Sequence, residues 1–114
     1  MKNDEPKTRK DLLPGTLEML ILKTLSIEPM HGYGIAQHIQ LLSAGVLTVE
    51  EGSLYPALQR MLVKGWVLAE WKISANNRRA RFYTLTTAGK KQLGVEESRF
   101  SQMFGAIRRV MKTS

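Results

Sequence analysis

The sequence predicts a mainly α fold with one small β-hairpin and a long C-terminal helix. Three observations support this prediction. Apolar residues recur at helical spacing in three segments before Gly65, they alternate with other residues in the two segments that follow, and a seven-residue repeat appears after Thr87. The chain has 114 residues, of which 43% are hydrophobic, so it is the size of one domain with an appendage. We expect three parts: a flexible arm at 1–11, a domain at 12–86 and a helix at 87–114.

The first helix is predicted to start near Pro14 or Thr16, since both residue types favour helix starts, and to stop before Glu28-Pro29. Its apolar stripe consists of Leu13, Leu17, Leu20, Ile21 and Leu25. A second helix of about ten residues is predicted in HGYGIAQHIQLL, where Ile35, Ile39 and Leu42 have helical spacing. The glycines at its start would allow a close approach to a neighbouring element.

The third helix lies in GSLYPALQRMLVKGW, where Leu54, Leu58, Met61 and Leu62 share one face. Ser53 is the expected N-cap, which would place Pro56 at the third helical position. There the missing amide hydrogen would matter little, because the first amides of a helix have no partner within it. Lys64-Gly65 is expected to end the helix with a glycine cap.

A hairpin is predicted next. Val67, Ala69, Trp71 and Ile73 alternate onto one face of its first strand, and RFYTLT returns as the second. The asparagines of ANNRRA suit a turn, so the tip should be basic. Trp66 and Trp71 are both expected in the core, because each adjoins the alternating apolar pattern.

The last helix should be capped by Thr86 or Thr87 and run to about residue 112, with Gly94 as a position where it could kink. Leu93, Phe100 and Ile107 recur every seven residues along it. Such a helix would be about 39 Å long, longer than a core of this size can cover. The stripe beyond the core therefore predicts a helix–helix contact with a partner.

This order of elements, three helices followed by a hairpin and a further helix, is that of a winged helix-turn-helix. The charge distribution agrees with it. The net charge is +7, and residues 60–91 carry this whole excess, with eight basic residues against Glu70 alone. A positive excess confined to one segment favours a polyanionic partner, which for this fold is double-stranded DNA.

The face of the third helix opposite its apolar stripe is the candidate reading face. It consists of Ser53, Pro56, Gln59 and Arg60, with Tyr55 at its edge. Ser53 and Tyr55 could donate to phosphates, while Gln59 and Arg60 are long enough to reach base edges. An ordinary solvated helix face is the alternative.

At the hairpin tip, Arg78, Arg79 and Arg81 suit phosphates and narrow minor grooves, against the alternative of a solvated turn. Tyr33 could donate to a phosphate or simply pack within the protein. His31 and His38 lie seven residues apart without other ligands at suitable spacing, so we expect no metal site, and no cofactor is predicted.

Four stretches, LLPGTLEMLILKTL, HGYGIAQHI, VEEGSLYPALQRMLVKGW and RRARFYTLTTAG, resemble the PadR family of transcriptional regulators, in particular its compact subfamily with a single C-terminal helix. The resemblance covers nearly the whole chain. It implies a dimeric winged-helix protein, usually a repressor, that binds an inverted-repeat operator. It also implies that Tyr55 and its neighbours, with the three tip arginines, face DNA.

The resemblance further implies a homodimer formed by the C-terminal helix, and a small aromatic effector that binds near that interface. The residues assigned to this region are Phe100, Met103, Phe104, Ile107 and Met111. For Phe100, Met103 and Phe104, packing in the interface is the favoured alternative to lining an effector site.

Two other function classes are alternatives to a DNA-binding regulator. A winged helix can serve as a protein-interaction adaptor without binding DNA, and the basic hairpin disfavours this alternative. An enzyme is the weakest alternative, because no Ser/His/Asp set, glycine-rich phosphate loop or carboxylate pair is visible. The sequence has neither an apolar run long enough for a membrane span nor a signal peptide, so a cytoplasmic protein is expected.

Overall fold

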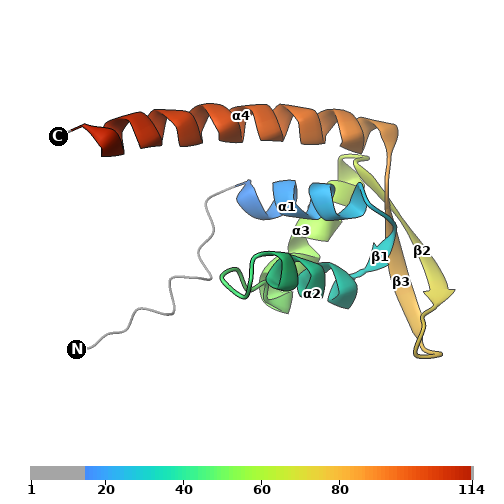
Figure 1. Ribbon diagram of the computed structural model, residues 1–114. Coiled ribbons are helices and arrows are strands. Elements are labelled where there is room, and N and C mark those ends of the chain that lie inside the picture. Colours follow the sequence, from blue (N-terminus) through green and yellow to red (C-terminus); the bar gives the residue numbers. More distant parts are fainter. Residues whose placement is uncertain (1–14, 114) are drawn as a thin grey trace.

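The computed structural model describes residues 15–113, which form four helices and a three-stranded antiparallel sheet that lies at one side of the helices (Figure 1). The helices are α1 (Thr16–Leu25), α2 (Gly32–Leu42), α3 (Glu51–Val63) and α4 (Thr87–Lys112), and the strands are β1 (Met30–His31), β2 (Val67–Ile73) and β3 (Arg79–Leu85). The predicted arm at 1–11, together with Leu13 and Pro14, lies outside the described residues. The mainly α fold with a hairpin and a long last helix is confirmed.

The core lies where α1, α2 and α3 meet the base of the hairpin. Its largest fully buried side chains are Ile21, Leu22, Ile35, Leu54, Leu58, Met61 and Val67. Each predicted helical stripe contributes to it, as expected for helices that bury one face. Of the three apolar residues at helical spacing in α2, Ile35 and Ile39 are buried, whereas Leu42, the last residue of the helix, is 71% exposed.

The predicted start of α3 was also wrong. The N-cap is Glu50 in extended conformation, the helix begins at Glu51, and Pro56 stands inside it. At this depth proline removes the backbone hydrogen bond to the carbonyl four residues earlier, which belongs to Gly52. Packing of Leu54, Ala57 and Leu58 on the core holds the helix together on both sides of the proline.

Two local signals at the ends of the hairpin were predicted and are confirmed. Gly65 adopts φ +77°, and the Trp66 amide donates to the Met61 carbonyl at 3.0 Å, which closes α3 with a left-handed glycine. At the start of α4, the Thr86 hydroxyl accepts from the Gly89 amide at 3.0 Å. The same hydroxyl donates to the Gly65 carbonyl at 2.7 Å, so Thr86 ties the two ends of the hairpin together.

The sheet has the order β1-β3-β2. Within the hairpin Val67 pairs with Leu85, Ala69 with Tyr83, and Trp71 with Arg81. The predicted alternation is confirmed near the base, where Val67 and Tyr83 are buried. The prediction of a core position for Trp71 was wrong, because the hairpin extends beyond the helices and leaves this indole 57% exposed (Figure 1). Trp66 packs against the core as a partly buried residue.

The two-residue strand β1 was not predicted. It pairs with β3 through Met30 and His31.

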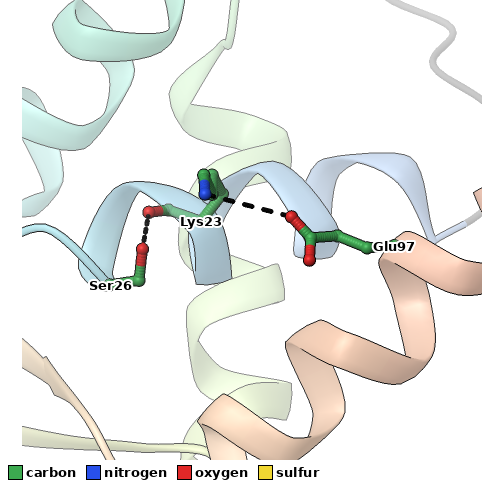
Figure 2. Close-up of polar contacts among 3 residues, drawn as sticks. All are labelled: Lys23, Ser26 and Glu97. Atoms are coloured by element: carbon green, nitrogen blue, oxygen red, sulfur yellow. Dashed lines mark hydrogen bonds and ion pairs between the residues drawn. The ribbon is translucent and has the colours of Figure 1, made fainter.

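α4 is a single helix of 26 residues, and Gly94 does not divide it. Its first half packs along α1, and its second half, drawn in red, continues well past the other elements (Figure 1). One ion pair joins the two helices, between Lys23 Nζ and Glu97 Oε2 at 3.9 Å (Figure 2). At the C-terminal end of α1, the Ser26 hydroxyl donates to the Lys23 carbonyl at 2.6 Å (Figure 2).

Candidate nucleic-acid interface

The outer face of α3 is exposed over its whole length. Ser53, Tyr55, Pro56 and Gln59 are all exposed, whereas Leu54, Ala57, Leu58 and Met61 on the opposite face are buried. The helix is thus fixed by one face and offers the other to a partner. Val63 extends this outer face and is also exposed, although an aliphatic side chain offers no hydrogen bond to DNA.

Arg60 differs from the other candidate residues of α3 because it already has a partner. Its Nε donates to Glu18 Oε2 of α1 at 2.9 Å. The Glu18 side chain is only 15% exposed, while that of Arg60 is 55% exposed. The guanidinium therefore lies at the α1 edge of the outer face, with other N–H groups still available.

Tyr55 lies at the opposite edge of α3, against the start of α2. Its ring covers Gly32, and a Cβ atom at Gly32 would overlap the Tyr55 ring and hydroxyl. The expected close approach at Gly32 is thus confirmed. Burial, followed by the nearby Glu51 carboxylate, raises the pKa of the Tyr55 phenol above its ordinary value. Tyr55 consequently remains a hydrogen-bond donor at neutral pH.

The start of α2 brings a second tyrosine to this side of the protein. Tyr33 is exposed, and its hydroxyl accepts a hydrogen bond from Gln37 Nε2 at 3.3 Å, which leaves the hydroxyl hydrogen free to donate outward. His31 precedes it as the N-cap of α2, where Nδ1 accepts from the Gly34 amide at 3.0 Å. This hydrogen bond gives His31 a structural role.

A shallow recess lies between the two tyrosines and the inner face of the hairpin. We call it the tyrosine recess, and its walls include His31, Gly32, Tyr33, Tyr55, Trp71 and Arg81. These residues come from β1, α2, α3 and both strands of the hairpin, and two hydroxyls and a guanidinium are among them. Hydroxyl and guanidinium donors that line one recess suit an anionic group such as a phosphate.

The hairpin tip carries the predicted arginines. Asn77 adopts φ +61° in the turn, and the Ser74 amide donates to the Arg78 carbonyl at 2.7 Å. Arg78, Arg79 and Arg81 are all exposed. Arg79 lies over the Trp71 ring with 4.9 Å to its centroid, and Arg81 lies over the Tyr83 ring at 6.0 Å. The tip therefore presents positive charge on aromatic supports.

The second half of α4 carries the residues predicted for a partner helix. They are exposed by about half or more: Phe100, Met103, Phe104, Ile107 and Met111. The Phe100 and Phe104 rings stack at 5.7 Å, and Arg108 lies over Phe104. A groove between α1 and α4 is lined by Met19, Leu20, Lys23, Glu97, Phe100 and Ser101.

The model of the transcriptional regulator PadR-like family matches residues 21–95, which include α2, α3, the hairpin and the start of α4. The chain belongs to this family. It is a PadR-family transcriptional regulator, and the resemblance noted in the sequence is confirmed. The family is one of regulators and is not an enzyme class.

Solved structures agree. A transcriptional regulator from Clostridium thermocellum is similar over 90% of this chain and 100% of its own, with a TM-score of 0.81 at 21% identity. A PadR-like transcriptional regulator from Bacillus cereus is 26% identical, covers 92% of this chain and 100% of its own, and has a TM-score of 0.78. An uncharacterized protein X from Lysinibacillus sphaericus is 27% identical over 85 residues, which are 75% of this chain and 78% of that protein.

Within residues 15–113 of this PadR-family chain, no helix is long and apolar enough to cross a membrane. No group of three or more His, Asp or Glu side chains in the same range could hold a metal ion.

Sequence reasoning missed two residues of the candidate interface in this PadR-family protein, His31 as a helix cap and Trp71 as a member of the recess, and it did not identify Tyr55 as the neighbour of Gly32. A cap at His31 could have been inferred from its place just before the second helix. The position of Trp71 required knowing where the helices stop covering the sheet.

Proposed function

We propose that this PadR-family protein is a sequence-specific DNA-binding repressor, which acts in the cytoplasm as a homodimer on an inverted-repeat operator. The observation that carries the proposal is the exposed donor-rich surface formed by the outer face of α3, the tyrosine recess and the arginine tip. In a winged helix-turn-helix these are the elements that meet the major groove and the flanking backbone.

The residues of this surface take different roles in the proposal. Tyr33, Ser53 and Tyr55 donate to phosphates, and Pro56 lies on the exposed α3 surface next to the bases. Gln59 reads base edges from the exposed outer face of α3. Arg78, Arg79 and Arg81 supply charge around the hairpin.

Arg60 also contacts DNA in this proposal, from its position beside Glu18. The 2.9 Å contact with the Glu18 carboxylate orients the guanidinium along the α1 edge of α3. An arginine fixed in this way gives up less side-chain freedom when it meets a guanine or a phosphate.

The dimer and the effector belong to the other end of the chain. The exposed stripe on α4 pairs with the same stripe of a second copy, because an apolar helix face of this length gains free energy when water is removed from it. The groove between α1 and α4 then provides a site for a small aromatic effector beside Phe100. An effector held there would contact both the helix that carries Glu18 and the helix that forms the dimer.

The test is binding to fragments of the source genome, measured across salt concentrations. If the dimer neutralises six to ten phosphates, affinity should fall by about 10³- to 10⁵-fold between 50 and 200 mM salt. Binding that is insensitive to salt, or no binding to any fragment in dilute buffer, contradicts the proposal.

A matched pair of variants separates affinity from specificity. Changing Arg78 and Arg79 together should weaken binding to all duplexes, whereas Gln59→Ala should change which sequences are preferred. An adaptor is favoured instead if the wild-type protein binds no DNA and a variant with charge-reversed tip arginines still binds a protein partner.

A further inference from the structure

Trp71 is an unusual residue for an exposed position near the end of a hairpin. Its side chain lies on the face of the sheet that buries Val67 and Tyr83 at the base, but the indole itself is 57% exposed. Tryptophan has the largest side chain, so leaving most of its ring in water forgoes much of the stabilisation that burial gives. Part of the ring lines the tyrosine recess, and the rest faces the solvent.

The exposed ring supports one specific arginine. Arg79 pairs across the hairpin with Ile73, so it is the diagonal neighbour of Trp71, and its guanidinium carbon lies 4.9 Å from the ring centroid. A guanidinium over an aromatic face uses its flat side for the contact and keeps its N–H groups at the rim. The Trp71 ring therefore supports the Arg79 guanidinium, and the exposed Arg79 side chain keeps N–H groups for a partner.

Arg78, the preceding residue, provides a contrast within the same tip. It belongs to the turn, its amide and carbonyl are tied to Ser74, and its side chain contacts no aromatic ring among residues 15–113. The two arginines carry the same charge and are both exposed. Of these two arginines, only Arg79 lies over an aromatic ring of the described residues, that of Trp71.

We infer that Trp71 is a positioning residue that holds the Arg79 guanidinium ready to enter a narrow, A·T-rich minor groove beside the site contacted by α3. This inference rests on the proposed DNA binding. A narrow minor groove concentrates negative potential and attracts arginine, and it admits a flat group only in a restricted orientation. A phosphate on the outside of the duplex makes no such demand, and Arg78 is suited to it.

The expected loss of DNA affinity follows from the side-chain conformational freedom that Arg79 would lose on binding if Trp71 did not already restrict it. Immobilising one long side chain on binding corresponds to about a two- to tenfold loss of affinity. Loss of the ring should therefore weaken binding by about that factor. The loss should be confined to duplexes with A·T pairs where the hairpin lies.

The experiment is a pair of double-mutant cycles on a duplex that the wild-type protein selects from a random pool. Trp71→Leu is combined with Arg79→Ala in one cycle and with Arg78→Ala in the other. We expect Trp71→Leu to have little further effect once Arg79 is alanine, whereas it should have its full effect in the Arg78→Ala background. Equal coupling to both arginines, or none to Arg79, would overturn the inference.

Two further measurements complete the test. Trp71→Phe keeps an aromatic face and should retain most of the affinity that Trp71→Leu loses. Replacing A·T by G·C pairs under the hairpin should weaken wild-type binding more than it weakens binding by Trp71→Leu; a penalty of the same size in both proteins contradicts the inference. Wild-type protein that selects no duplex would instead refute the proposed function, so the two failures are distinguishable.

Discussion

The two halves of α4 have the same apolar spacing but different surroundings. Leu93, Phe100 and Ile107 follow each other at seven-residue intervals, and their side chains are 8%, 47% and 48% exposed. Only the first of the three lies over the core, since the helix continues beyond α1 (Figure 1). The first part of the repeat therefore contacts the domain itself, and the exposed part is the stripe proposed to pair with a second copy of the chain.

Breaking the second contact should have the largest effect on function. Ile107→Asp places a charge in the exposed stripe, where it would be buried without a partner on dimerisation. We expect a folded monomer whose affinity for a two-site operator falls by about 100-fold or more, because the second site no longer gains from the first. Sedimentation and operator binding measure both quantities.

Gln102→Asp is the matched control, because it also replaces an uncharged, exposed residue of α4 by aspartate, on the side of the helix opposite the stripe. It should leave the dimer intact. An Ile107→Asp variant that remains dimeric would show that the stripe on α4 is not the dimer interface.

Breaking the first contact should instead affect folding. The first turn of α4 passes so close to the hairpin that a Cβ atom at Gly89 would overlap the Trp66 carbonyl oxygen and Leu85. Overlap with backbone cannot be relieved by rotating a side chain, so Gly89→Ala should lower the free energy of unfolding by about 3 kcal/mol. Denaturant unfolding measures this change.

Gly94→Ala is the control in the same helix. No atom lies within 4 Å of its added Cβ, and alanine favours helix over glycine by up to about 1 kcal/mol. We expect a stability equal to or above that of the wild type. If both glycine variants lose stability equally, close packing at Gly89 is not the reason that glycine stands there.

The same comparison explains which features could be predicted from sequence. Gly65 and Thr86 follow local rules for helix ends, and the structure confirms both. Ser53 met the same local rule and was wrong as an N-cap, because α3 begins two residues earlier, at Glu51, and contains Pro56. A capping residue permits a helix to start at its position, and the contacts of the folded chain determine where the helix begins.

The candidate interface shows the same limit. Alternation in the hairpin assigned Trp71 to the correct face of the sheet, but it could not show where the helices stop covering that face. Arg60 was correctly placed at the exposed surface of α3, yet its partner Glu18 lies 42 residues away on another helix. Contacts of this range depend on the packed fold, and no short pattern in the sequence contains them.

The smallest expected effect concerns the boundary between the two halves of α4. Lys23 and Glu97 meet at 3.9 Å with both side chains more than half exposed (Figure 2). Such surface pairs contribute roughly 0 to 1 kcal/mol, so Lys23→Gln should lower stability by less than about 0.5 kcal/mol.

The groove that Lys23 lines also contains Phe100, which places the pair between the core and the proposed effector. An aromatic carboxylate in that groove would compete with Glu97 for the ammonium group. If the proposed effector carries a carboxylate, Lys23→Gln should weaken its binding more than it weakens folding, which calorimetry and unfolding together would measure. Equal affinity for the effector in wild type and variant would show that the groove does not use this charge.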